Sequence, residues 1–149
     1  MLLLALLVLA WGPLPHPVRA QAPPPGTPAP DATLRELQQA LADATLRFHA
    51  MDTAGVLAHV SPQYRNGPIT KASIREHLLT LFALYDTVRA RIRLDEVRMV
   101  DGAAWVYSTG LVSGRLRGIG AWTTVLSWER EPEVARRDQN AWRLVGLGP

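Results

Sequence analysis

One segment determines the architecture that we expect of this chain, Thr87-Val88-Arg89-Ala90-Arg91-Ile92-Arg93-Leu94. Apolar residues occupy every second position of it, with threonine or arginine between them. A period of two residues is typical of a β-strand that has one buried and one solvated face. Upstream of Asp86 the apolar residues recur every third or fourth position instead, as they do in amphipathic helices. The sequence therefore predicts helices before Asp86 and strands after it.

Three helices are expected in the first half. The first spans residues 33 to about 49, with Thr33 and Glu36 at the spacing of a capping box and Asp31 as a second possible cap. Asp52 is a suitable N-cap for a second, short helix. The third covers residues 71 to 85 and carries its own apolar stripe. All three can bury one face against a sheet.

The second half predicts the rest of that sheet. The first strand continues through residues 97–100 after a bulge at Asp95-Glu96, and Asp101-Gly102 is a hairpin turn. Three further strands are expected, with a polar connection at residues 131–140 before the last: residues 103–112, 118–130 and 141–147. Helices followed by a meander indicate an α+β fold in which the helices cover one face of a curved antiparallel sheet.

The N-terminal residues have the features of an export signal. Residues 2–11 are apolar but too few to span a bilayer, which needs roughly 20. Val18-Arg19-Ala20 suits signal peptidase, so we expect residues 1–20 to be removed after Ala20. Residues 21–32 are rich in proline and are expected to form a disordered leader to a domain at 33–149. These features predict a periplasmic or secreted protein that has no membrane span after cleavage.

Composition excludes several kinds of chemistry. Cysteine is absent, which rules out disulfides, zinc–thiolate sites and cysteine nucleophiles. A net charge of +3 with no basic run gives no support for nucleic-acid binding. The histidines after residue 20 lack the spacing of metal ligands, and no glycine-rich segment opens a helix. We therefore expect no metal and no cofactor.

The order of elements resembles the nuclear transport factor 2-like (NTF2-like) superfamily, which includes SnoaL-like proteins, ketosteroid isomerase and scytalone dehydratase. The segments that carry the resemblance are the helix ending near His49, Asp52-Thr53-Ala54-Gly55, Ser61-Pro62-Gln63-Tyr64, Ser73 to Leu78, Asp101 to Val106, and Asn140 to Gly146. The resemblance implies a cone-shaped α+β barrel with a pocket between helices and sheet, and a homodimer formed through the outer sheet face. It does not settle function, because members include enzymes, transport adaptors and proteins with no known activity.

Acid–base candidates are few. A general base would be a carboxylate on an inward-facing strand position. The carboxylates in and around the expected strands are better explained as turn or surface groups: Asp95, Glu96, Asp101, Glu129 and Glu131. His49 lies three residues before Asp52, yet Asp52 is expected to use its side chain as a cap. His77 borders an apolar stripe, as does His59. The remaining proton-handling candidates are His49, His77 and Tyr64.

Aromatic residues suggest where a pocket would lie. Trp105 and Tyr107 share one strand face, and Trp122 and Trp128 share a parity on the next strand. They can line a ligand pocket, meet a second subunit, or fill the core of a small cone. Candidate pocket residues are Tyr64, Tyr85, Trp105, Tyr107 and Trp122.

Arginines form a second pattern on the first strand. Arg89, Arg91 and Arg93 share one face, which suits an anionic ligand or an acidic partner. The alternative is a solvated face that discourages pairing at a sheet edge.

Three functions stay open. The favoured one is an exported SnoaL-like module, not an enzyme, that binds a small apolar molecule or acts in an interaction. The alternative is an isomerase or lyase without a cofactor that uses pocket histidine and tyrosine groups. A third is a homodimer in an envelope assembly.

Overall fold

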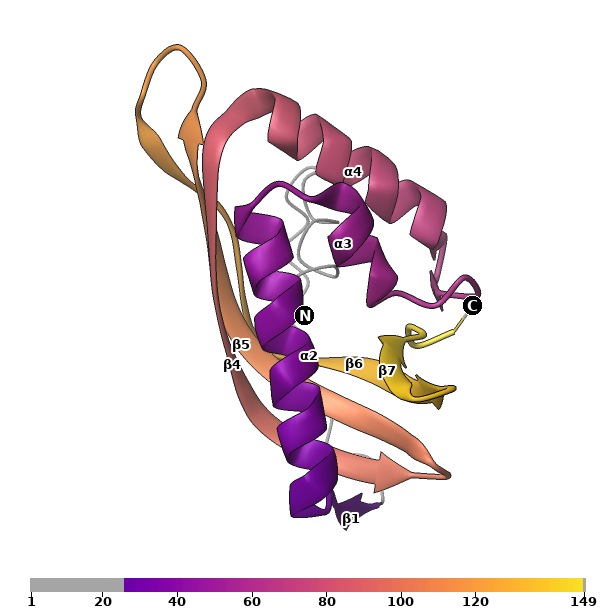
Figure 1. Ribbon diagram of the computed structural model, residues 1–149. Coiled ribbons are helices and arrows are strands. Elements are labelled where there is room, and N and C mark those ends of the chain that lie inside the picture. Colours follow the sequence, from indigo (N-terminus) through magenta and orange to yellow (C-terminus); the bar gives the residue numbers. More distant parts are fainter. Residues whose placement is uncertain (1–25, 149) are drawn as a thin grey trace.

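The computed structural model describes residues 26–148 and shows three helices on the concave side of one curved antiparallel sheet (Figure 1). The helices are α2 (Asp31–His49), α3 (Thr53–Ala58) and α4 (Lys71–Leu84). The sheet order is β1 (Thr27–Pro28), β4 (Tyr85–Val100), β5 (Ala103–Leu116), β6 (Trp122–Asp138) and β7 (Ala141–Leu144). A separate small ladder pairs β2 (Arg65–Asn66) with β3 (Ile69–Thr70). The α+β prediction is confirmed, but the sheet is open, so the predicted barrel closure is wrong.

The helices lie in a fixed arrangement over that sheet. Figure 1 shows α2 along the concave face, with α3 and α4 stacked beside its C-terminal half. The β5–β6 hairpin projects beyond α4, and Ile119 at its tip is 76% exposed. The change of period near Asp86 is therefore the point where the helical layer gives way to the sheet, because β4 follows α4 directly.

Capping residues show which local signals were reliable. Asp52 caps α3 as predicted, since its Oδ1 accepts from Gly55 N at 2.9 Å. The predicted Thr33 cap is wrong: α2 begins at Asp31 after Pro30, with no side-chain cap. The locked φ of Pro30 suits a helix start, and Leu34 N bonds to its carbonyl at 2.9 Å. At α4 the capping box is formed by Thr70 and Ser73.

Strand β6 is longer than the sequence suggested. The polar segment at residues 131–140 was expected to be a connection, but β6 runs through it to Asp138. Glu133 pairs with Val106, and Ala135 with Ala104, on the concave face. The segment keeps the alternation of a strand, although its inward residue is a glutamate. The prediction is wrong because polar composition alone does not exclude a strand that keeps its pairing with β5.

Bulges decide which side chains face the helices. The register shift between Leu94 and Glu96 confirms the predicted bulge in β4. A second register shift lies between Val112 and Ser113 of β5, where Val125 of β6 is an extra residue with no partner in the register. Trp122 and Trp128 therefore face opposite sides despite their shared parity: Trp128 is in the core, and Trp122 is 44% exposed.

No helix between residues 26 and 148 is both long enough and apolar enough to cross a membrane. The predicted signal peptide at 1–20 and residues 21–25 of the predicted leader lie outside the described residues. Export therefore stays a prediction.

Candidate functional site

An apolar cavity of about 40 Å³ lies beneath α2, between that helix, α3 and the sheet. Small residues create the space, because Ala40 and Ala44 of α2 face Ala135 of β6 across it. A water molecule needs about 10–15 Å³ by the same measure, so a few water-sized groups fit. The full lining is Leu37, Ala40, Leu41, Ala44, Thr45, Val56, His59, Leu94, Val106, Ala135, Trp142 and Leu144.

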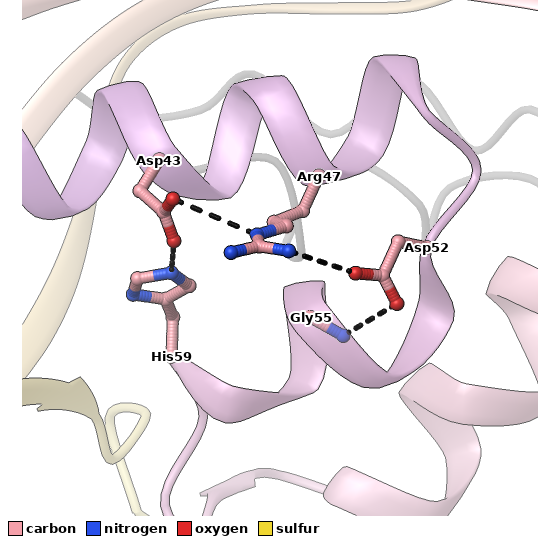
Figure 2. Close-up of polar contacts among 5 residues, drawn as sticks. All are labelled: Asp43, Arg47, Asp52, Gly55 and His59. Carbon is pink, nitrogen blue, oxygen red and sulfur yellow. Dashed lines mark hydrogen bonds and ion pairs between the residues drawn. The ribbon is translucent and has the colours of Figure 1, made fainter.

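His59 brings a polar group to this cavity. It lies at the C-terminal end of α3, and its Nε2 is 2.8 Å from Asp43 Oδ2 on α2 (Figure 2). The hydrogen bond from His59 is the main cause that lowers the pKa of Asp43, and the nearby Arg47 adds to it. Asp43 is therefore ionised at neutral pH and accepts a hydrogen bond from the protonated Nε2 of His59. The other ring nitrogen of neutral His59 is then an acceptor.

Arg47 extends this contact into a chain of polar groups between α2 and α3. Its Nε lies 3.6 Å from Asp43 Oδ1, and its Nη1 lies 3.4 Å from Asp52 Oδ2. Asp52 also accepts from Gly55 N, as Figure 2 shows. The cap, the guanidinium and the carboxylate together fix the position of His59.

A second polar pair lies inside the cone. Tyr64 and Glu133 are 2% and 0% exposed, and the tyrosine hydroxyl donates to Glu133 Oε1 at 2.9 Å. Burial, then the charge of Glu133, raises the pKa of Tyr64 far above its ordinary value. Tyr64 therefore remains a hydrogen-bond donor across the accessible pH range. Tyr64 was a predicted candidate, whereas Glu133 was missed, so the prediction that no strand carboxylate faces inward is wrong.

Two neighbouring groups enlarge this interior polar region. Ser108 is fully buried and its Oγ accepts from Trp128 Nε1 at 3.1 Å. Glu131 pairs with Ser108 in the sheet register and is partly buried. Burial, together with the charge of Glu133, raises the pKa of Glu131. Its expected surface role is therefore wrong, because a bulge at Arg130 turns this end of the strand inward.

The other histidine candidates do not reach the cavity. His49 Nε2 lies 2.9 Å from Ala90 N at the edge of β4. His77 Nδ1 donates to Ser73 O of its own helix at 2.7 Å. Neither ring is among the cavity lining.

Most of the predicted aromatic lining lies elsewhere. Trp105, Tyr107 and Trp122 are on the convex face of the sheet, away from the helices, and none lines the cavity. Arginines cover two of them: Arg89 lies 4.5 Å from the Trp122 ring, and Arg130 lies 5.6 Å from the Tyr107 ring. Tyr85, another of the aromatic candidates, packs against the core, and its hydroxyl accepts from the Thr123 hydroxyl at 3.4 Å.

Within residues 26–148, no group of three or more metal-ligating side chains comes together. The expectation of a protein without metal or cofactor stays a prediction. The chemistry present is that of two separate polar pairs, His59–Asp43 and Tyr64–Glu133.

Three helices on the concave side of an open, strongly curved antiparallel sheet match the cone fold of solved NTF2-like proteins. Solved structures agree. A conserved protein from Planctomyces limnophilus aligns with a TM-score of 0.68 at 12% identity, over 78% of this chain and 94% of that one. A protein of the NTF2-like family from Streptomyces avermitilis, named as a candidate dehydratase, gives 0.62 at 12% identity over 78% and 94%. A ketosteroid isomerase-like protein from Erwinia carotovora gives 0.57 at 16% identity over 80% and 99%.

No protein-family model and no curated protein matches the sequence. Identities this low establish the fold alone. The function therefore has to be argued from the side chains.

Proposed function

We propose that this domain binds a small, largely apolar molecule, with its apolar part in the cavity beneath α2 and a polar group hydrogen-bonded to His59. One observation carries this function. The cavity wall is apolar apart from a few polar groups, and one of these, His59, is fixed by Asp43 at 2.8 Å. A concave apolar site with few oriented polar groups is the usual design of a small-molecule site.

The geometry favours a ligand with a hydroxyl or carbonyl group. Asp43 keeps the Nε2 proton in place, so the remaining nitrogen of His59 can accept from a hydroxyl. A protonated His59 can donate to a carbonyl instead. A cavity of about 40 Å³ holds only part of a molecule, so we expect it to anchor an alkyl or ring edge.

Filling the cavity should abolish binding. We expect Ala44→Leu to remove the affinity for a fragment set of small cyclic ketones, alcohols and hydrocarbons, because the added carbons occupy the ligand space. His59→Gln should lower the affinity for the ketones and alcohols by about fivefold and leave the affinity for the hydrocarbons unchanged, since one hydrogen bond contributes roughly 1 kcal/mol. Binding is measured from amide chemical-shift changes.

Ala32→Leu is the matched control, because Ala32 lies exposed on the same helix and outside the cavity. It should bind every fragment as the unmodified protein does. Equal fragment binding by the Ala44→Leu variant would contradict the assigned site.

A second candidate function is acid–base catalysis by Tyr64 and Glu133. A carboxylate buried beside a tyrosine that stays protonated is suited to moving a proton next to a carbonyl group, as an isomerase or lyase does. Relatives of the same fold named for isomerase and dehydratase chemistry support it. In a screen of β-hydroxy and unsaturated ketones, Glu133→Gln should abolish any turnover that His59→Gln retains. Equal rates for the two variants would remove this candidate.

Dimerisation also stays a prediction. Leu111 and Trp122 are 38% and 44% exposed on the convex face, which supports a partner there.

A further inference from the structure

The first part of β4 is an unpaired sheet edge. Residues 88–94 pair with β5 on one side, and no strand among residues 26–148 pairs with them on the other. Strand β1 pairs with β4 at Arg98 and Met99, and Ala29 N donates to Val97 O. All three positions lie beyond the bulge, so β1 does not extend over residues 88–94. Unpaired edges expose backbone donors and acceptors that can pair with another strand.

An open groove of about 700 Å³ runs between this edge and α2. Five consecutive residues of β4 line it, Ala90 to Leu94. Successive side chains of a strand point to opposite faces of the sheet. Five consecutive residues can therefore line one groove only where the groove lies along the edge of the strand. The opposite wall is α2, where Leu46 is 66% exposed and lies near Leu41 and Ala42.

His49 occupies part of the place of a neighbouring strand. Its Nε2 lies 2.9 Å from Ala90 N and 3.2 Å from Ala90 O, so both backbone groups of Ala90 point into the groove. Backbone groups of alternate residues face the same side of a strand, which places those of Ile92 at this edge too. Because Nε2 either accepts from Ala90 N or donates to Ala90 O, the ring satisfies only one of these groups at a time, whereas an added strand would satisfy both.

The charges beside the groove are positive. Arg89 is stacked on Trp122, and Arg93 pairs with Asp95 at 2.8 Å. Arg91 is exposed, lines the groove, and has no ion pair among residues 26–148. An occupant with carboxylates on this side would complete the pattern.

We propose that this edge binds an extended peptide segment of a partner protein, with an acidic side chain toward Arg91 and apolar side chains toward Leu46. The segment adds to the sheet as a strand, so its backbone supplies affinity and its alternation supplies specificity. A second copy of this chain is a poor occupant, because antiparallel edge pairing would place the arginines of both copies opposite one another. The groove adjoins the cavity proposed to bind the small molecule and shares Leu41, Thr45 and Leu94 with it, but Arg91 and His49 line the groove alone.

A labelled peptide of alternating glutamate and valine, seven residues long, tests the proposal by fluorescence anisotropy. We expect saturable binding that Arg91→Glu weakens by tenfold or more. Arg136→Glu is the matched control, because Arg136 is an exposed arginine on β6 outside the groove, and its affinity should equal that of the unmodified protein. His49→Ala should bind several-fold more tightly, since Ala90 is freed for the peptide.

Two control peptides separate strand addition from simple charge attraction. The same sequence methylated at alternate backbone nitrogens should not bind, and a lysine–valine peptide should not bind either. Equal affinity for the methylated peptide, or an Arg91→Glu variant that binds like the Arg136→Glu variant, would overturn the proposal. Self-association of the protein that His49→Ala strengthens would assign the edge to a second copy and overturn it as well.

Discussion

Replacing Glu133 by alanine should lower the free energy of unfolding by about 3 kcal/mol or more. Two costs combine, because Glu133 is fully buried and accepts from the Tyr64 hydroxyl at 2.9 Å. A buried hydroxyl that loses its acceptor costs about 1–3 kcal/mol. Removing a large buried side chain leaves a cavity that adds about 1–2 kcal/mol. Urea unfolding followed by circular dichroism measures the sum.

Glu133→Gln is the matched control for this result. Glutamine keeps the volume and one carbonyl acceptor for Tyr64, so the expected loss is about 1 kcal/mol. Tyr64→Phe removes the donor alone, and the double variant gives the coupling energy of the pair. An alanine variant as stable as the glutamine variant would show that the Tyr64 hydroxyl does not depend on Glu133.

The parts of the fold predicted from sequence are those set by local signals. The change of period at Asp86 placed the border between helices and sheet, and Asp52 was identified as a cap from its spacing to α3. Such features depend on residues within a turn of one another. Helix α2 ended as predicted at His49 for the same reason.

Glu133 could not be predicted in this way. A glutamate beside Pro132 is typical of an exposed segment, and its burial makes sense only with Tyr64, which lies 69 residues earlier in the chain. A weak signal was nevertheless present. Glu133 and Ala135 lie on one face of the strand, and Val134 lies on the other. All three are buried, as is typical of a strand covered on both faces.

The His59–Asp43 pair shows a related limit. His49 and Asp52 are only three residues apart, so their spacing suggests a pair. The partners in the structure, His59 and Asp43, are separated by 16 residues, and Asp43 lies on α2 whereas His59 lies at the end of α3. The packing of α3 on α2 brings His59 and Asp43 together. The residue pattern within one helix does not predict how two helices pack on each other. Trp122 was assigned to the wrong face for a different reason, since the irregularity in β6 places Trp122 and Trp128 on opposite faces.

Replacing Gly146 by alanine should destabilise the protein by about 3 kcal/mol or more. Gly146 is buried with φ of +78°, a conformation that costs an alanine roughly 1 kcal/mol. In addition, a Cβ there would overlap the carbonyl oxygen and carbon of Arg65, and backbone atoms cannot move aside as a side-chain tip can. Thermal and urea unfolding of the variant measure the effect.

Gly118→Ala is the control, because Gly118 has the same φ of +78° but no neighbour within 4 Å of an added Cβ. It should lose only the backbone cost of roughly 1 kcal/mol. Equal losses in the two variants would show that Arg65 yields without penalty.

The Gly146 variant should also disturb the interior pair. Arg65 N donates to Val145 O at 3.0 Å, and Gly148 N donates to Arg65 O at 3.0 Å, so the C-terminal segment holds the chain that directly follows Tyr64. Displacing Arg65 moves Tyr64 relative to Glu133. The cost of Glu133→Gln should therefore be smaller in the Gly146→Ala background than in the Gly118→Ala background, because neighbouring effects are not additive. Identical costs in both backgrounds would mean that the C-terminal segment stabilises the cone without positioning the tyrosine.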